Sequence, residues 1–411
     1  MKKDKFYFFN LLIFKILLEI SYIYVVFPNY KYTGFLLNIN FIKLLESYLM
    51  FFIIFFLIPN QKKISVNFIN LFFIFHFIPI SSYYYLSDNY RKYIYLLFIS
   101  YILIIIGIKL CDKIKIKSLI NININFEYFL FFIIGLFIIY SLKFVGKINL
   151  EVFLLKNIYE IRGNLKMIGI INYLVPWFGN IIVPAFILNS FLKNKKFFFI
   201  LGFFFQMIIF SIYPFKSFFM LPFFMIINVI YYEKKDYLNK ISNFLNISIL
   251  FSIFSFYFFN RIYLLSLIVR RVFLLPARIN FIYYDYIFKG GKKLFYSEGK
   301  IGKLFNQNYP YDLDFANYIG KIYFGREDMR VNTGMFSDAY VNIGSIGIIL
   351  ISILLILFLF YLDNISKGKE KFTWGIIVMY IVGLTNSSLF TTLLTHGLII
   401  ALILVKIVKN K

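Results

Sequence analysis

The chain has 411 residues, of which 61% are hydrophobic and 15% are charged, and its mean hydropathy is +0.78. Soluble domains contain about a quarter charged residues, so this composition argues for a protein embedded in lipid. The formal net charge is +25, but the lysines cluster in short segments between apolar runs, as in the cytoplasmic loops of membrane proteins. We therefore expect no nucleic-acid partner. A single cysteine, Cys111, excludes an intrachain disulfide and a cysteine-based metal site.

Apolar runs of about 20 residues, the length that a membrane-spanning helix needs, recur along the chain. They predict twelve spans, at residues 6–27, 41–58, 66–86, 93–110, 126–145, 168–191, 197–213, 216–232, 243–262, 340–362, 372–388 and 390–408. The first run is too long for the core of a signal peptide, so we expect it to be retained. The segment "IYPFKSFFMLP" fits a tight hairpin or a broken helix. The short "TNSS" before the last run leaves a re-entrant segment open.

The lysine-rich connections predict the orientation of the chain. With twelve spans, "MKKDK", "NQKK", "KLCDKIKIK", "KNKK", "EKKDYLNK", "SKGKEK" and "VKNK" all fall on one side. This side is predicted to be cytoplasmic and to hold both termini. The predicted organisation is a bundle of nine spans in residues 1–260 with an outer loop at 143–166, a large external loop at 261–339 and a final set of spans at 340–411.

The stretch "RRVFLLPARINFIYYDYIF", residues 270–288, places charges beside the large external loop. Arg271, Arg278 and Asp285 are spaced so that they would share one face of a continuous helix. Pro276 disfavours strict continuity, so we expect a kinked amphipathic helix at the outer interface. Its arginines either reach toward lipid headgroups and do nothing more, or form a cradle for an anion, because guanidinium groups bind phosphate oxygens in pairs.

In the cradle interpretation, the diphosphate-binding residues are Arg162, Arg270, Arg271, Arg278 and Arg330. The segment "YFGREDMRVNTGMFSDAYVNIGSIG" places Arg326 and Arg330 just before a predicted span and Asp338 at its mouth. Asp338 equally fits a helix N-cap, and the glycines that follow it fit close helix packing.

Metal and nucleotide chemistry find little support in the residues. The only histidines, His76 and His396, lie in predicted spans far apart in the sequence, so we expect no metal site. No Walker motif is present, and we expect no cofactor.

The segments "IYEIRG", "RRVFLLPARINFIYYDYIF", "NTGMFSDAYVNIGSIGIIL" and "SSLFTTLLTHGLIIALIL" resemble, in order and placement, the O-antigen polymerases of the Wzy type. The resemblance covers about the last two thirds of the chain. It implies an all-α polytopic fold like that of the GT-C glycosyltransferases, with a large external loop between the ninth and tenth spans. It also implies a place in the bacterial cytoplasmic membrane, with the active site on the outer face.

The reaction that the resemblance implies is metal-independent glycosyl transfer, in which a glycan on polyprenyl diphosphate passes en bloc to the next lipid-linked repeat unit. The expected partners are polyprenyl-diphosphate-linked oligosaccharides, membrane lipids and a chain-length regulator, in the synthesis of lipopolysaccharide O-antigen or capsule. The arginines would stabilise charge on the leaving diphosphate. Asp285 or Asp338 would accept the proton of the attacking hydroxyl, with Asp285 preferred because it lies in the arginine-bearing stretch.

Two other functions stay open. A flippase for lipid-linked oligosaccharides would need charges facing a central cavity within the spans. An O-antigen ligase has a similar layout but carries a histidine in the large external loop, and residues 261–339 contain none.

Overall fold

The computed structural model describes residues 5–111, 114, 125–144, 146–154, 157–165, 169–232, 234, 236–299, 302 and 306–409. Over these residues the protein is all-α, which confirms this part of the prediction, and its one β feature is an isolated bridge between Asn38 and Ser87. The chain divides into two compact units. Unit 1 comprises Met1–Lys115, Asp236–Phe360 and Ile381–Leu389, and unit 2 comprises Ile116–Lys235, Tyr361–Tyr380 and Phe390–Lys411.

Unit 1 consists mainly of two stretches of the chain. The N-terminal helices pack against the helices that follow residue 236. Its first half contains α1 (Lys5–Ser21), η1 (Tyr22–Val26), α2 (Phe27–Tyr30), η2 (Lys31–Thr33), α3 (Phe41–Leu57), α4 (Ile64–Phe72), η3 (Phe73–Phe77), α5 (Ile78–Leu86) and α6 (Arg91–Cys111). Its second half contains α13 (Tyr237–Phe259), α14 (Tyr263–Leu265), η6 (Ser266–Leu274), α15 (Leu275–Phe288), α17 (Phe315–Phe324), α18 (Met335–Ile343) and α19 (Ser345–Ile365). Helix α1 packs against α13 and α5, and α15 packs against α18 and α5.

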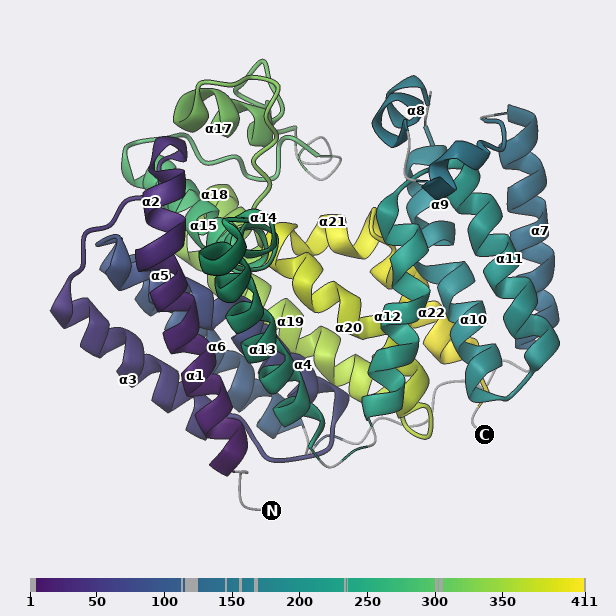
Figure 1. Ribbon diagram of the computed structural model, residues 1–411, viewed down its shortest axis with the longest axis horizontal. Helices are drawn as coiled ribbons and strands as arrows, with labels where there is room; N and C mark the ends of the chain where they lie inside the picture. Colours follow the sequence, from purple (N-terminus) through teal and green to yellow (C-terminus); the bar gives the residue numbers. More distant parts are fainter. Residues whose placement is uncertain are drawn as a thin grey trace. The chain divides into compact units, whose positions relative to one another are not determined.

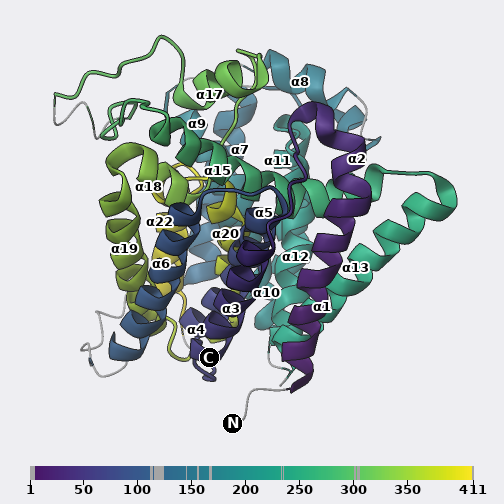
Figure 2. The same cartoon turned by 90° about the vertical axis from the view of Figure 1, so that its left-hand side faces the viewer.

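Helix α17 sits over α15 and α18 in both views of the ribbon (Figures 1 and 2). A buried cluster holds it there, in which Phe315 and Ile319 of α17 contact Ile282 and Tyr286 of α15 and Val341 of α18. This part of the segment predicted as an external loop therefore has a hydrophobic core of its own.

Unit 2 is a smaller helical bundle. It contains α7 (Phe126–Phe144), η4 (Leu150–Leu154), α8 (Ile158–Asn164), α9 (Ile171–Trp177), η5 (Phe178–Ile182), α10 (Val183–Leu192), α11 (Lys196–Ile212), α12 (Lys216–Tyr232) and α22 (Leu398–Ile407). Helix α10 is central and packs against α7, α11 and α12, while η5 packs against α22. Helices α19, α20 (Glu370–Asn386) and α21 (Leu389–Leu394) each contribute residues to both units.

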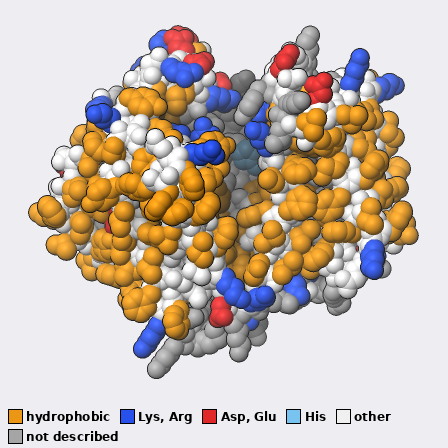
Figure 3. Space-filling view, viewed as in Figure 1, with side chains coloured by type: hydrophobic (Ala, Val, Ile, Leu, Met, Phe, Trp, Pro, Cys, Tyr) orange, Lys and Arg blue, Asp and Glu red, His pale blue; other side chains and the backbone are white. Residues whose placement is uncertain are grey.

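Seven helical segments of the described chain are long and apolar enough to cross a membrane: Lys5–Thr33, Ile64–Leu86, Arg91–Cys111, Phe126–Phe144, Ile171–Leu192, Tyr237–Phe259 and Ser345–Ile365. The other five predicted spans contain the shorter helices α3, α11, α12, α20 and the pair α21 and α22. On the visible face of each unit in Figure 3, hydrophobic side chains form a broad band, and most Lys and Arg side chains lie above or below it. This distribution is the one expected of helices in contact with lipid.

In the described parts of the chain, four π-helices interrupt the α-helices, and each ends two residues before a proline. The prolines are Pro28, Pro79, Pro184 and Pro276, which follow η1, η3, η5 and η6. In each case the residue before the proline donates its N–H to the carbonyl five residues earlier. A proline ring clashes with the carbonyl four residues before it, and the wider π turn relieves that clash without breaking the helix.

The structure distinguishes the two alternatives that the sequence left open for the segment "IYPFKSFFMLP". Helix α11 ends at Ile212 and α12 begins at Lys216, so the segment between them is a tight hairpin. The last predicted span, 390–408, is two short helices separated at Gly397, whose φ of +76° favours glycine.

Residues 270–288 differ from the predicted amphipathic helix. The helix is continuous through Pro276, but ten of the fourteen residues of α15 are buried. Arg271 is exposed and Arg278 is buried, so the two do not share one environment. The physical reason is the wider turn of η6, across which the rotation per residue of an α-helix no longer holds.

Candidate functional site

Arg278 is the most buried of the candidate residues, with 7% of its surface exposed. Its Nη1 donates to the carbonyl oxygen of Thr33 at 2.6 Å, and its guanidinium lies 5.1 Å from the ring centroid of Phe35 and 5.0 Å from that of Phe324. A side chain on Gly34 would overlap the guanidinium, so glycine makes room for it. Burial lowers the pKa of Arg278.

No carboxylate pairs with Arg278 among the residues that the structure describes. A buried charge is normally paired, because desolvation is costly. Here the ring faces of Phe35 and Phe324 and the carbonyl oxygen of Thr33 offset part of the cost of burying the guanidinium charge. Arg278 is therefore a cation suited to bind an anion.

The guanidinium of Arg270 also contacts an aromatic ring. Its Nε donates to Ser266 Oγ at 2.9 Å, and its guanidinium lies 4.3 Å from the ring centroid of Tyr30 on α2. Since η2 follows α2 directly, Arg270 and Arg278 both contact the short segment 30–35. Two of the five predicted diphosphate ligands thus contact the same short connection.

The other three arginines have different surroundings. Arg271 is exposed and has no hydrogen bond or ion pair within the described chain. Arg330 is also exposed, and its Nη2 lies 3.4 Å from Asp314 Oδ2. Arg162 belongs to unit 2, where its guanidinium lies 4.5 Å from the ring centroid of Phe215. The cradle of five arginines stays a prediction.

Asp285 on α15 is held by three donors. Lys289 Nζ lies 2.8 Å from Oδ2, Tyr323 donates to the same oxygen at 2.7 Å, and Tyr90 donates to Oδ1. Burial raises the pKa of Asp285, but these donors outweigh burial and keep the pKa below its ordinary value. A carboxylate stabilised in this way is a weak base, so its contacts favour a structural role that joins α15 to α17 and to the start of α6.

Asp338 on α18 is the opposite case. It is half-buried, and its carboxylate accepts no hydrogen bond from the described residues. Burial, and secondly the charge of Glu298, raise the pKa of Asp338 to about 7. A carboxyl group with this pKa can exchange a proton near neutral pH, which suits a general base.

The neighbours of Asp338 are acidic and aromatic. Its charge acts on Tyr283 and Tyr296, and Tyr283 is also affected by Glu298 and Arg330. Burial raises the pKa of Glu298, whose Oε1 accepts the N–H of Phe315 at 2.9 Å. Asp338 and Arg330 therefore share one electrostatic environment.

A polar link fixes α18 against α15. Ser337, adjacent to Asp338, donates to Asn280 Oδ1 at 2.7 Å and contacts Thr333 Oγ1 at 2.6 Å. Tyr93 donates to the same Asn280 oxygen at 3.0 Å. Asn280 and Arg278 both belong to α15, so this link joins the helix that carries Asp338 to the helix that carries the buried arginine. Neither Asn280 nor Ser337 is recognisable as functional from the sequence.

A second polar cluster, within the spans, was not predicted. Lys15 on α1 is fully buried, and its Nζ lies 2.8 Å from Glu19 Oε1. It also donates to Ser47 and Ser82, each at 2.9 Å, while Tyr48 donates to Glu19 Oε2 at 2.6 Å. The sequence signal was a lysine and a glutamate four residues apart inside an apolar run, which share one helix face. Intramembrane ionisable residues are often functional.

Comparisons of the chain with models of protein families, with curated proteins and with solved structures find no match. In the described part of the chain, no group of three or more His, Cys, Asp or Glu side chains is placed to hold a metal ion. The candidate functional residues of unit 1 are Arg278 and Arg270, which contact the segment 30–35, and Asp338 on α18.

Proposed function

We propose that the protein is an oligosaccharide repeat-unit polymerase, a GT-C-type glycosyltransferase of twelve spans in a bacterial cytoplasmic membrane. Two observations support this proposal best: Arg278 is a buried cation without a carboxylate partner among the described residues, and Asp338, in the same unit, is a carboxyl group whose pKa is about 7. The two lie on helices joined through Ser337 and Asn280. Glycosyl transfer from a diphosphate requires both a cation for the leaving group and a base for the nucleophile.

In the proposed reaction, Asp338 accepts the proton of the attacking sugar hydroxyl as its oxygen bonds to the anomeric carbon of the donor glycan. The bond between that carbon and the diphosphate oxygen breaks at the same time, and polyprenyl diphosphate leaves with the electron pair. Arg278 and Arg270 stabilise the charge that develops on the diphosphate. Asp285, which the sequence favoured, is assigned the structural role described above.

The test compares matched variants in cells from which the gene has been deleted. Asp338→Asn and Arg278→Lys are expected to lower chain extension by at least about a hundredfold, the usual range for a general base or a charge-stabilising group. The controls are Asp328→Asn and Arg326→Lys, because these exposed residues pair with each other outside the site. The readout is the length distribution of the surface polysaccharide, with membrane insertion checked by immunoblot.

Three outcomes separate the functions. A polymerase variant accumulates single-repeat glycolipid, whereas full-length chains left on the lipid carrier indicate a ligase. Normal chain length in Asp338→Asn and Arg278→Lys would contradict the proposal. Deleting residues 261–339 is a poorer test, because α15 and α18 are part of the core of unit 1.

A flippase for lipid-linked oligosaccharides is the second candidate, and the buried pair of Lys15 and Glu19 favours it. A transporter uses intramembrane charges to hold a polar substrate or a coupling ion. Under this alternative, substitution of Lys15 and Glu19 together would stop export of the lipid-linked unit. Asp338→Asn would leave export unchanged.

A further inference from the structure

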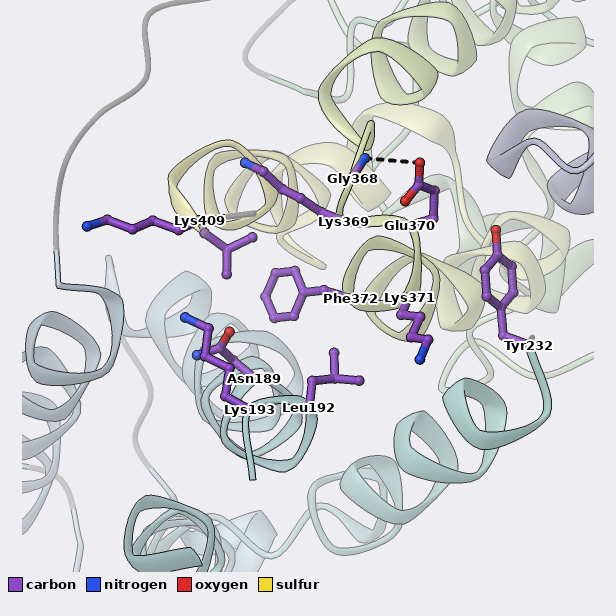
Figure 4. A pocket seen from close by; sticks show the side chains of 11 residues that line it. Asn189, Leu192, Lys193, Tyr232, Gly368, Lys369, Glu370, Lys371, Phe372 and Lys409 are labelled. Atoms are coloured by element: carbon purple, nitrogen blue, oxygen red, sulfur yellow. Dashed lines mark hydrogen bonds between the residues drawn. The ribbon is translucent and has the colours of Figure 1, made fainter. Parts of the chain in front are cut away.

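A cavity of about 300 Å³ lies in unit 2, at the ends of α10, α12, α20 and α22. This volume is at the lower end of the range for small-ligand sites, about 300–1,000 Å³. Its charged lining consists of Lys193, Lys369, Glu370, Lys371 and Lys409 (Figure 4). In this view the amino groups of Lys193, Lys369 and Lys409 lie on one side of the Phe372 ring and that of Lys371 on the other.

The lysines outnumber the carboxylates that neutralise them. Glu127, only 2% exposed, accepts Lys193 at 3.2 Å and Lys195 at 3.0 Å, as well as the amide of Asn189 at 3.0 Å. Glu370 accepts the backbone N–H of Gly368 at 3.0 Å. Among the described residues, these two carboxylates stand against four lysines, Lys193, Lys195, Lys369 and Lys409, so an excess of positive charge is left at the cavity.

Lys369 is held in place without a carboxylate. Its Nζ donates to the carbonyl oxygens of Val405 at 3.0 Å and Lys406 at 3.2 Å, at the C-terminal end of α22. Burial lowers the pKa of Lys369. A partly buried ammonium group oriented by carbonyls has one donor left for a ligand, and an anion would relieve its desolvation.

These lysines come from three separate connections, "KNKK", "SKGKEK" and "VKNK". The tendency of cytoplasmic loops to be positive explains why each connection is basic. It does not explain why three of them converge on one cavity with an apolar floor made by Leu192, Phe372 and Val408. Convergence of cations from distant segments is typical of an anion site.

We propose that this cavity binds a phosphate group, carried by an anionic phospholipid or by a soluble phosphate compound. Lysine acts as a point charge toward phosphate, and basic pockets between membrane helices bind lipid headgroups. The surroundings suit the lipid source, because α12 exposes Ile227, Ile230 and Tyr231 just before Tyr232, which lines the cavity. An acyl chain can lie along these side chains while the phosphate meets the lysines.

The test uses the purified full chain in a neutral detergent. Native mass spectrometry measures binding of phosphatidylglycerol, with phosphatidylcholine as the zwitterionic comparison. The variant is Lys369→Gln/Lys409→Gln. The control is Lys143→Gln/Lys147→Gln, which removes the same charge near the C-terminal end of α7, whereas Glu127 lies near the N-terminal end of that helix. We expect the first variant to bind phosphatidylglycerol about thirtyfold more weakly, since each lysine contributes a factor of about five. The control should bind it as the unmodified protein does.

Inorganic phosphate distinguishes the two sources. If the ligand is the lipid, inorganic phosphate does not displace phosphatidylglycerol. If the ligand is a soluble phosphate compound, inorganic phosphate competes with phosphatidylglycerol. It then also raises the melting temperature of the unmodified protein but not of the variant. The proposal is overturned if the variant binds phosphatidylglycerol and responds to phosphate as the unmodified protein does, or if phosphatidylcholine binds equally well. Should the double variant fail to fold, Lys409→Gln alone, at an exposed side chain, is expected to weaken binding about fivefold.

Discussion

The carboxyl groups of Asp338 and Asp285 illustrate how two aspartates in one unit acquire opposite properties. Asp285 receives a lysine and two tyrosine hydroxyls, which stabilise its charge. Asp338 has only burial and a neighbouring glutamate, which destabilise its charge. The pKa of a carboxyl group thus depends on the donors around it rather than on its place in the sequence.

The raised pKa of Asp338 has a consequence for stability. Its pKa is about 7 in the folded protein against 3.8 for an unperturbed aspartate. Below about pH 4 the group is protonated in both folded and unfolded states. Between about pH 4 and 7 the unfolded chain releases the proton and the folded protein retains it, so folding is progressively weakened.

Asp338→Asn removes this penalty. We expect the variant to melt at a higher temperature than the unmodified protein at pH 8, with the difference shrinking as the pH falls toward about 4. Thermal unfolding across this pH range measures it. Asp328→Asn is the control, because Arg326 lowers the pKa of that exposed carboxylate and no gain is expected. Equal melting temperatures at pH 8 would show that Asp338 is not destabilised by its surroundings.

The buried ion pair of Lys15 and Glu19 gives a second prediction about stability. Lys15→Met leaves Glu19 buried without its cation and should cost about 3–5 kcal/mol of stability. The double variant Lys15→Met/Glu19→Gln removes both charges and should cost less. Denaturant unfolding in detergent measures both, and Lys5→Met, at an exposed position of the same helix, is the control. If the double variant is as unstable as the single one, the serines and tyrosines rather than the charges dominate the cluster.

Among the elements, each π-helix determines the direction in which the side chains before the following proline point. The π-helix η6 carries Arg270 and Arg271, and α15 carries Arg278. The wider turn between them directs Arg270 to Tyr30 while Arg278 points to Phe35. Both arginines reach the same connection because of this turn.

Pro276→Ala tests that relationship. Alanine restores an N–H that can bond to the carbonyl four residues earlier, so η6 can return to an α-helix and rotate Arg270 away from Tyr30. Under the proposed function we expect polysaccharide extension to fall at least about tenfold, because small displacements of positioning groups are costly. The melting temperature should change little. Pro222→Ala, inside α12 where no π-helix precedes the proline, should leave extension unchanged.

For the whole molecule, the twelve-span prediction specifies which side each connection faces. In a background with Cys111→Ser, single cysteines at Lys147 and Asn332 should react with a membrane-impermeant maleimide in intact cells. Cysteines at Asn194 and Lys367 should react only after permeabilisation. All four positions are exposed. Labelling of Asn194 in intact cells would contradict the predicted orientation.

The helices themselves were predictable, because apolar runs of span length dominate this sequence. The site was predictable only in part. The sequence drew attention to Arg278 and Asp338, but it ranked Asp285 above Asp338, since the donors Tyr90 and Tyr323 are distant along the chain. Seven-residue spacing placed Arg271 and Arg278 on one face, and it was misleading because a π turn does not keep the α-helical rotation. The contacts of Lys15 with Ser47 and Ser82 likewise require tertiary structure.

The order of synthesis gives the Lys15 cluster a further consequence. Helix α1 leaves the ribosome before α3 and α5, which carry the hydroxyls of Ser47, Tyr48 and Ser82. Until they arrive, the lysine and glutamate have only each other, and hydrocarbon is a poor solvent for them. Release of α1 from the insertion machinery is therefore expected to wait for the segment Ile64–Leu86, which contains α5, so that these helices enter the bilayer as a group rather than one at a time.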